Sequence, residues 1–221
     1  MEVRDTKVDL GFSCKCDVGK AKHLMGSYFM MFNPSPNQII SSLLPLEESY
    51  DEYIARCKKK YKGNVIRDAR KADKLGCSCR RFVWDAYISD ISKINRSMSV
   101  RCGGVMRDSY LGEPSSLKCG IKPWSLECDQ HWDIPYGIFY EGRLIAYIKL
   151  KRVKDLVLYS QILGHGKYLR QGIMYNLHFA IRRWLDPTDD KYIMYAGHFD
   201  GGKGLLLWKK KTLFEPHRIF I

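Results

Sequence analysis

The chain has 221 residues, of which 45% are hydrophobic, and it carries a formal net charge of +13 at pH 7. This length and hydrophobic content are enough for a buried core in one large or two small domains. No apolar run approaches the roughly 20 residues that a membrane-spanning helix needs. The charged start, Met1–Asp5, lacks the apolar stretch of a signal peptide. We therefore expect no membrane span and a cytoplasmic location.

The charge and the cysteines narrow the classes of partner. An excess of 37 Lys and Arg over 24 Asp and Glu attracts polyanions such as tRNA, DNA or acidic lipid. A basic surface without a specific partner is the alternative. Disulfides are rare inside cells, so the eight cysteines are expected to be reduced thiols or metal ligands.

Two helices are predicted after an N-terminal stretch without clear periodicity. Ser49 and Glu52 form a capping-box pattern, in which each side chain satisfies the other residue's backbone N–H. Apolar and aromatic residues then recur at helical spacing, which predicts a helix over Tyr50–Tyr61. A second helix is predicted from Val65 to Leu75, with Gly76 as its stop.

The rest of the first half is less regular. Cys77–Trp84 alternates as a strand does, and Asp85 is the expected N-cap of a helix that reaches Ile94. Residues 101–126 are rich in Gly, Pro and Ser, which predicts a connecting loop. The expected N-terminal domain, residues 1–126, is therefore basic and rich in helices.

From Tyr136 onward the pattern changes to strands. Three strands, a glycine turn, a helix, a fourth strand and a short helix are predicted, over residues 136–141, 143–151, 156–163, 164–166, 172–184, 192–196 and 204–208. This order predicts an α/β (α+β) fold, a mixed sheet flanked by helices, in a C-terminal domain of residues 127–221. The glycine turn and helix start place free backbone N–H groups at the sheet edge, where an anionic donor group could bind.

Two local motifs lie within this second domain. Gly164–Met174 follows the pattern Gln/Arg-x-x-Gly-x-Gly/Ala only in part, because Leu169 and Met174 replace its first and last residues. The second motif is Gly204–Lys209, followed by Phe214. Together with the order of elements, these motifs resemble the GNAT acyltransferase superfamily.

The resemblance implies a site between two strands. In the family, the strand equivalent to Leu156–Leu163 splays from the next parallel strand, and the acyl donor lies in the gap. The following turn holds the pyrophosphate of acyl-CoA. The second motif looks like the Gly-x-x-x-Phe-Lys ending of the Fem and leucyl-transferase branch, which has two GNAT-like halves and takes aminoacyl groups from tRNA. The degenerate turn and the positive charge agree better with that branch, so the first half is expected to be helix-rich or a second GNAT-like half.

These features predict an acyl- or aminoacyltransferase. The implied donor is acyl-CoA or aminoacyl-tRNA, and the acceptor is an amine or a hydroxyl group, in one version on a nucleic acid. The phage Mom-type enzymes, which modify DNA adenine, share the GNAT core and would also explain the charge. The alternative function is a nucleic-acid-binding protein that keeps the GNAT-like fold without its chemistry.

Acyl transfer requires proton removal from the nucleophile, stabilisation of the carbonyl oxygen and joint positioning of both reactants. The candidate catalytic residues are His165, His198, Lys209 and Tyr195. The candidate donor-binding residues are Gln161, Gly164, Gly166, Arg170 and Gly172. For each side chain a structural role stays open, as a hydrogen-bonded turn histidine, a solvated lysine or a core tyrosine.

Further candidates concern nucleic acid and metal. The basic stretch Arg56–Lys74 looks like the Arg/Lys-rich helix of the Fem branch, and its candidate phosphate contacts are Lys58, Lys59, Arg67, Arg70 and Lys71. A solubilising face is the alternative. Cys119, Cys128 and His131 have the spacing Cys-x8-Cys-x2-His and could bind zinc. Buried reduced thiols are the alternative there.

Overall fold

The structure, a computed structural model, describes residues 2–11, 29–30, 39–101, 104–118 and 130–221. Its strands are β1 (Arg4–Lys7), β2 (Phe29–Met30), β3 (Ser41–Pro45), β4 (Ser78–Arg81), β5 (Val100–Arg101), β6 (Gly104–Val105), β7 (His131–Tyr140), β8 (Arg143–Val153), β9 (Leu156–Gly164), β10 (Tyr192–Gly197) and β11 (Glu215–Phe220). Its α-helices are α2 (Tyr50–Tyr61), α3 (Asn64–Lys74), α4 (Ile88–Arg96), α5 (Asp108–Leu111), α6 (Ile173–Leu185) and α7 (Lys203–Lys211). Its 3-10 helices are η1 (Trp84–Tyr87), η2 (Pro114–Leu117) and η3 (Gly166–Gln171). No helix in these ranges is long and apolar enough to cross a bilayer.

The described strands form one large mixed sheet. Nine strands belong to it, in the order β1-β11-β3-β10-β9-β8-β7-β4, with β2 paired to β11. β7, β8 and β9 are antiparallel neighbours, whereas β9 and β10 run parallel. A separate two-stranded sheet consists of β5 and β6. The predicted mixed sheet flanked by helices is confirmed, and so is the order of elements from β7 to α7.

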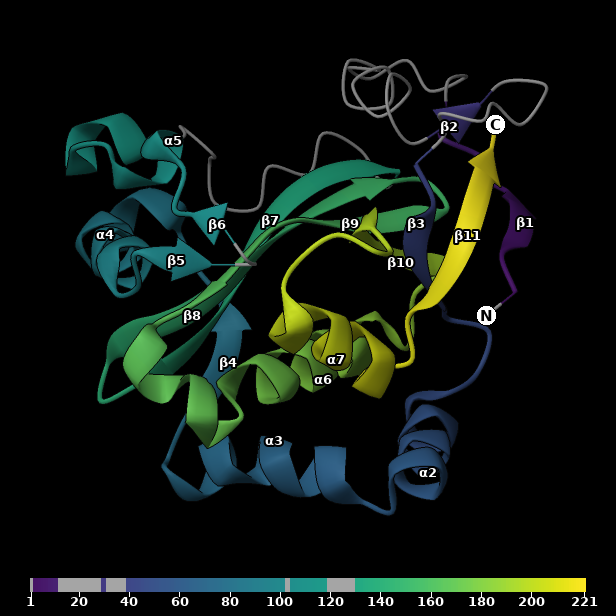
Figure 1. The fold of residues 1–221 in the computed structure, drawn as a ribbon, viewed down its shortest axis with the longest axis horizontal. Coiled ribbons are helices and arrows are strands. Elements are labelled where there is room, and N and C mark those ends of the chain that lie inside the picture. Colours follow the sequence, from purple (N-terminus) through teal and green to yellow (C-terminus); the bar gives the residue numbers. More distant parts are fainter. Residues whose placement is uncertain (1, 12–28, 31–38, 102–103, 119–129) are drawn as a thin grey trace.

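Helices cover both faces of the sheet (Figure 1). Successive side chains of a strand point to opposite faces. On β7, Ile138 therefore packs into the core made with α2, α3 and α6, whereas its neighbour Phe139 packs into the core made with α4. On β8, Ile148 packs into the first of these cores and Tyr147 into the second. α6 lies against β7 and β8, and α3 packs on α6 as an outer layer.

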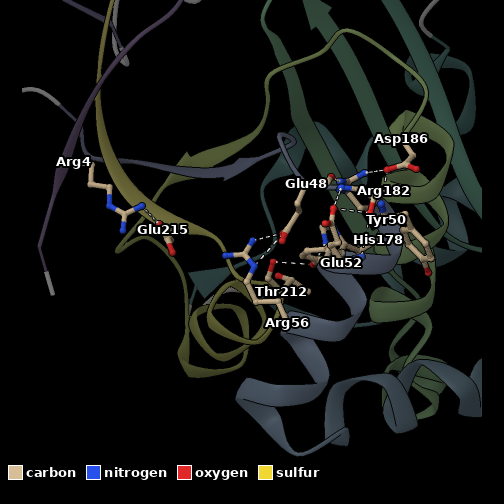
Figure 2. Close-up of polar contacts among 12 residues, drawn as sticks. Arg4, Glu48, Tyr50, Glu52, Arg56, His178, Arg182, Asp186, Thr212 and Glu215 are labelled. Atoms are coloured by element: carbon tan, nitrogen blue, oxygen red, sulfur yellow. Dashed lines mark hydrogen bonds and ion pairs between the residues drawn. The ribbon is translucent and has the colours of Figure 1, made fainter.

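Polar contacts fix α2 to α6 (Figure 2). Ser49 caps α2 as predicted, because its hydroxyl accepts from the N–H of Glu52, whose carboxylate accepts from the N–H of Ser49. The buried guanidinium of Arg182 on α6 donates to the carboxylate of Asp186, 2.9 Å away, and to the carbonyl of Glu48 just before α2. One arginine with several N–H donors therefore joins the start of α2 to the end of α6.

Three predictions for the first half are wrong in detail. Asp85 does not cap a helix, because η1 precedes α4 and Tyr87 stands at the N-cap position of α4 without a side-chain cap. The η1 turn brings the ring of Trp84 to 4.9 Å from that of Tyr147, which buries the indole and ends the predicted strand early, at Arg81. The predicted loop over residues 101–126 contains β6, α5 and η2 in its described part.

Six strands were not foreseen, namely β1, β2, β3, β5, β6 and β11. β3 is five residues long and almost wholly buried, so it shows no alternation, and it inserts between β10 and β11. β1, β3 and β4 precede the predicted boundary at residue 126 and pair with strands that follow it. One sheet therefore contains strands from both sides of that boundary.

Candidate active site

The neighbouring strands β9 and β10 separate part-way along their length. Their pairing begins at Tyr192 opposite Leu156 and extends to Met194 opposite Leu158. Beyond that point β9 stays with β8 as far as Gly164, whereas β10 follows β3. The two parallel strands therefore form a fork that opens toward their C-terminal ends, as the resemblance to the GNAT family implied.

A bulge in β9 lies where the fork opens. Lys149 of β8 pairs with Gln161, but the next residue of β8 pairs with Tyr159, so Ser160 is an extra residue. Its hydroxyl donates to the carbonyl of Lys149, 3.0 Å away. A bulge bends its strand and increases the local twist. The bulge lies just after Leu158, the last residue of β9 that pairs with β10.

A pocket of about 490 Å³ occupies the fork on the side of α6 and α7, and we call it the fork pocket. Its walls come from β9, β10, η3, α6, α7, β5 and the segment before β5. Most of its side chains are apolar, among them Met98, Ile162, Leu169, Met174, Leu205 and Trp208. Tyr195 of β10 also lines it. The fork therefore holds a largely apolar cavity.

A second pocket, of about 310 Å³, meets the fork from the β5–β6 side, and we call it the hairpin pocket. Ser160 and Gln161 of β9 line it, together with Met106 and Arg107 after β6. Four residues line both pockets, namely Arg101, Ile162, Leu163 and Tyr195. The two cavities therefore adjoin at the open end of the fork.

Arg101 fixes the corner between these pockets. Its guanidinium donates to the carbonyl of Gly164 at the end of β9 (2.9 Å), and to the carbonyl of Ile94 (2.7 Å) and the hydroxyl of Ser97 (2.9 Å) at the end of α4. The same hydroxyl accepts from the N–H of Gly166 at 2.9 Å. A cation at a helix C-terminus interacts favourably with the helix dipole. Sequence reasoning missed Arg101, since a lone arginine in an irregular segment carries no motif.

Of the four predicted catalytic residues, Tyr195 lines the two pockets in the described part of the chain, and the other three lie elsewhere. His165 caps η3, and its Nδ1 accepts from the N–H of Lys167 at 3.2 Å. Burial lowers the pKa of His165, and the cations of Arg101 and Lys167 lower it further. The neutral ring thus uses its basic nitrogen within the turn, and its Nε2 carries the proton.

His198 and Lys209 lie behind the fork, at the corner between β10 and α7. His198 Nδ1 is 3.1 Å from the hydroxyl of Ser42, and the side chain lines a different pocket, beside Glu215. Burial, and then the charge of Lys209, lower the pKa of His198. Lys209 is 1% exposed, and its ammonium donates to the carbonyls of Gly197 (2.5 Å) and Asp200 (3.1 Å). The ammonium therefore closes the loop that ends β10.

The predicted donor turn is packed rather than open. A Cβ built on Gly164 would lie 2.7 Å from Met174 Sδ and 2.9 Å from Leu169 Cδ2. These two side chains are the departures from the family pattern, and both line the fork pocket. Gly172, with a φ of +71°, presses so closely on α3 that a Cβ would lie 1.9 Å from the carbonyl oxygen of Asp68.

The other predicted donor-binding residues lie in different surroundings. Gln161 lies in the hairpin pocket and Gly164 in the fork pocket, whereas Gly166 is hydrogen-bonded to Ser97 and Arg170 is exposed. α3 contacts both η3 and α6 beside this turn. The side of the turn that faces α3 is therefore covered by protein.

The predicted phosphate contacts gather on α2 and α3. Lys58, Arg67, Arg70 and Lys71 line a shallow basic pocket of about 580 Å³, which we call the basic face, and Lys59 is exposed nearby on α2. At the border of the basic face, the carboxylate of Asp68 forms ion pairs with the ammonium groups of Lys71 (2.8 Å) and of Lys211 on α7 (3.5 Å). Lys211 Nζ also lies 5.7 Å from the ring centre of Tyr175, which lines the fork pocket. Cationic side chains therefore extend from α3 to the wall of the fork pocket.

The predicted metal ligands are only partly described. Cys119 and Cys128 lie outside the described residues. His131 is buried on β7, with its Nε2 2.9 Å from the carbonyl of Leu10. The described residues contain no group of three or more His, Cys, Asp or Glu that could hold a metal ion.

Searches of family models and of curated proteins found no match to the sequence. Among solved structures, FemX matches with a TM-score of 0.61 at 10% identity, over 91% of this chain and 66% of that chain. A conserved protein of unknown function from Bacteroides thetaiotaomicron VPI-5482 matches with a TM-score of 0.51 at 12% identity, over 90% and 64%. The chain has a GNAT-like fold. A tandem GNAT protein from the clavulanic acid biosynthesis pathway is matched over 98% of this chain and 59% of that chain, with a TM-score of 0.48 and 13% identity.

The GNAT-like chain thus spans less than two thirds of the length of these structures. At such low identities the likeness establishes the fold alone. The splayed strands, the bulge and the two adjoining pockets belong to this chain's own geometry, and its function must be argued from them.

Proposed function

We propose that this protein transfers an acyl or aminoacyl group to an amine or hydroxyl acceptor at the fork between β9 and β10. The observation that carries the proposal is the early end of the β9–β10 pairing at Leu158 and Met194, beside a largely apolar pocket. Strand edges released from pairing present backbone N–H groups that must find another partner. A carbonyl inserted in the fork would accept from such a group, which stabilises charge on its oxygen during transfer.

The donor turn favours an aminoacyl ester on tRNA over acyl-CoA. A pyrophosphate needs an open turn and helix N-terminus. Here Leu169 and Met174 fill the space above Gly164, and the carbonyl of Asp68 abuts Gly172. An aminoacyl end needs only the fork pocket, because the phosphates of its tRNA would lie elsewhere on the protein.

The basic face supports the same donor. Lys58, Arg67 and Arg70 form a cationic surface on α2 and α3, and Lys211 continues it toward the fork pocket. Clustered cations bind phosphates with a strong dependence on salt. We therefore assign the tRNA backbone to the basic face and its aminoacyl end to the fork pocket. Modification of a nucleic acid, as in Mom-type enzymes, stays a prediction.

The proposed reaction moves one proton overall, from the acceptor nitrogen to the leaving oxygen. The acceptor nitrogen attacks the donor carbonyl carbon and forms a C–N bond, and the C–O bond to the ribose breaks. The nitrogen loses a proton, and the leaving ribose oxygen gains one. Within the described residues no His, Asp or Glu lines either pocket. The hydroxyl of Tyr195 is therefore our proposed proton donor to the leaving oxygen, and it regains a proton from the acceptor nitrogen through solvent.

The test is a transfer assay with a matched pair of tyrosine variants. Purified protein is incubated with mixed aminoacyl-tRNAs or acyl-CoAs and a panel of amines, and the products are measured by mass spectrometry. We expect product with aminoacyl-tRNA, and a rate about 100-fold lower for Tyr195→Phe, because proton transfer typically contributes 10²–10⁴-fold. Tyr192→Phe is the control, since Tyr192 lies on the same strand at its paired end.

One outcome contradicts the role of Tyr195, and another contradicts the transfer itself. Equal rates for the Tyr195 and Tyr192 variants remove Tyr195 from the chemistry. Salt-dependent RNA binding with no product from any donor favours the alternative of a nucleic-acid-binding protein that keeps the fold without the reaction.

A further inference from the structure

The hairpin pocket is lined by cationic and polar side chains. Its described lining residues include two arginines, Arg101 and Arg107, and no acidic side chain. The polar groups of Ser160, Gln161 and Tyr110 also line it. At about 310 Å³ it lies at the small end of the range for ligand sites, roughly 300–1,000 Å³.

The two arginines differ in their hydrogen bonds and exposure. Arg101 is held by two carbonyls and a hydroxyl at 2.7–2.9 Å, so the direction of its guanidinium is fixed. Arg107 is exposed at the N-cap of α5, where it can move toward a ligand. Two guanidinium groups that line one pocket can bind the oxygen atoms of a carboxylate or phosphate through charge-assisted hydrogen bonds.

The pocket also lies where an acceptor must lie. It shares Ile162, Leu163 and Tyr195 with the fork pocket but approaches them from the β5–β6 side, whereas the fork pocket is bounded by α6 and α7. Two reactants that enter from opposite sides of β9 meet beside Tyr195. Holding both in one geometry is a major source of rate enhancement.

We propose that the hairpin pocket binds the acceptor, and that the acceptor is a small amine carrying a carboxylate or phosphate group. This inference rests on the proposed transfer at the fork. The anionic group contacts Arg101 and Arg107, and the amine points toward Tyr195. An α-amino acid, a short peptide and a phosphorylated amino alcohol all carry this chemistry.

Binding is measured without any transfer step, by NMR of protein labelled at its methionine methyl groups. Met106 lines the hairpin pocket, Met98 and Met174 line the fork pocket, and Met194 is buried elsewhere. The carboxylate arm compares alanyl-alanine with alanyl-alaninamide, and the phosphate arm compares phosphoethanolamine with ethanolamine. We expect the anionic member of at least one pair to shift Met106 and leave Met194 unchanged.

Charge-matched variants test the arginines. Arg107→Gln should weaken binding at least tenfold, Arg107→Lys should recover part of it, and Lys93→Gln should change it less than twofold. Lys93 is 60% exposed on α4 and lies outside both pockets. We vary Arg107 and not Arg101, because the Arg107 side chain is exposed and its substitution leaves the corner of the fork intact.

Each outcome supports or overturns the inference. A response in one arm alone supports it and identifies the anion as carboxylate or phosphate. Equal shifts with the neutral analogues, or equal losses of affinity in Arg107→Gln and Lys93→Gln, overturn it. Transfer to neutral amines at undiminished rates would overturn this inference and leave the proposed function intact. Anion-dependent binding without any transfer would support the anion site in the hairpin pocket and contradict the proposed function.

Discussion

At the scale of single residues, several buried polar groups hold the frame of the fork. His178 is wholly buried between two tyrosine hydroxyls, 2.9 Å from that of Tyr53 and 3.0 Å from that of Tyr159. The Tyr53 hydroxyl also donates to the carbonyl of Thr212, which follows α7. Tyr159 directly precedes the bulge in β9. One imidazole thus joins α2, α6 and the start of the fork.

His178 gives the protein a specific sensitivity to acid. Burial, with a further contribution from Arg182, lowers the pKa of His178 to about 3, against about 6.5 in an unfolded chain. The unfolded state therefore binds more protons between these values, and the free energy of unfolding falls as pH decreases from about 6.5 toward 3. The maximum slope from one group is about 1.4 kcal/mol per pH unit. His198 and His217, whose pKa values are also lowered, act in the same direction.

Urea unfolding at pH 7.5, 6.5 and 5.5 checks this pH dependence. His178→Gln should be less stable at pH 7.5 and should also lose part of the slope between pH 6.5 and 5.5. His165→Gln is the comparison, since that ring is only partly buried. A slope in His178→Gln as steep as in the unmodified protein would contradict the assigned pKa.

Lys209 gives a second prediction for a single residue. Its ammonium is buried and donates to backbone carbonyls at the end of β10, so Lys209→Met removes these charge-assisted hydrogen bonds. We expect a decrease of about 2–4 kcal/mol in the free energy of unfolding, because hydrogen bonds to charged groups are strong. Lys210→Met, at an exposed neighbouring position, should cost less than about 0.5 kcal/mol. Equal decreases in denaturant titrations would show that the hydrogen bonds of Lys209 contribute nothing.

At the scale of elements, sequence patterns predicted the strands and helices that have their own periodicity. The capping box at Ser49 and the stop at Gly76, where φ is +85°, are local signals and are confirmed. β3 and β11 could not be found in this way, since each is short and is specified by its partners in the sheet. The fork was implied by family resemblance, whereas the bulge at Ser160 has no sequence signal that we could identify.

The packing of α3 on α6 yields a prediction about one glycine. Gly172→Ala places a Cβ in the left-handed region and against the carbonyl of Asp68. Gly63→Ala has a similar φ, +73°, and open space around it, so it isolates the backbone cost of about 1–2 kcal/mol. The clash should add about 1–3 kcal/mol for Gly172→Ala alone. Thermal and urea unfolding of both variants test this difference. Equal destabilisation would mean that α3 shifts to accommodate the added Cβ at no cost in free energy.

At the scale of the whole molecule, the basic face on α2 and α3 continues through Lys211 to the wall of the fork pocket. Composition predicted a polyanionic partner but could not place it, since the face depends on how α2 and α3 dock on α6. The candidate site was likewise only partly foreseen. Tyr195 and Gln161 line the pockets, whereas the positions of His165, His198 and Lys209 follow from turn and core contacts.

Salt dependence tests the basic face. The double variant Arg67→Ala, Arg70→Ala should reduce the slope of log K against log salt concentration for tRNA binding by roughly 1.4–1.8, because each phosphate that an arginine neutralises adds about 0.7–0.9 to that slope. Lys93→Ala, Lys118→Ala removes the same charge on the α4 side and should change the slope little. Filter binding at several salt concentrations measures both slopes. Equal slopes for the two double variants would show that the tRNA phosphates bind to another surface.

The most direct test of the fork as the acyl site is methionine-methyl NMR with an RNA minihelix that carries an amide-linked amino acid. Met98 and Met174 line the fork pocket, and Met194 packs in a separate core. We predict that the aminoacylated minihelix shifts Met98 and Met174 while Met194 stays in place, and that the same RNA without its amino acid shifts them much less. If both RNAs bind and neither moves Met98 or Met174, the acyl group does not enter the fork, and the proposed function is wrong.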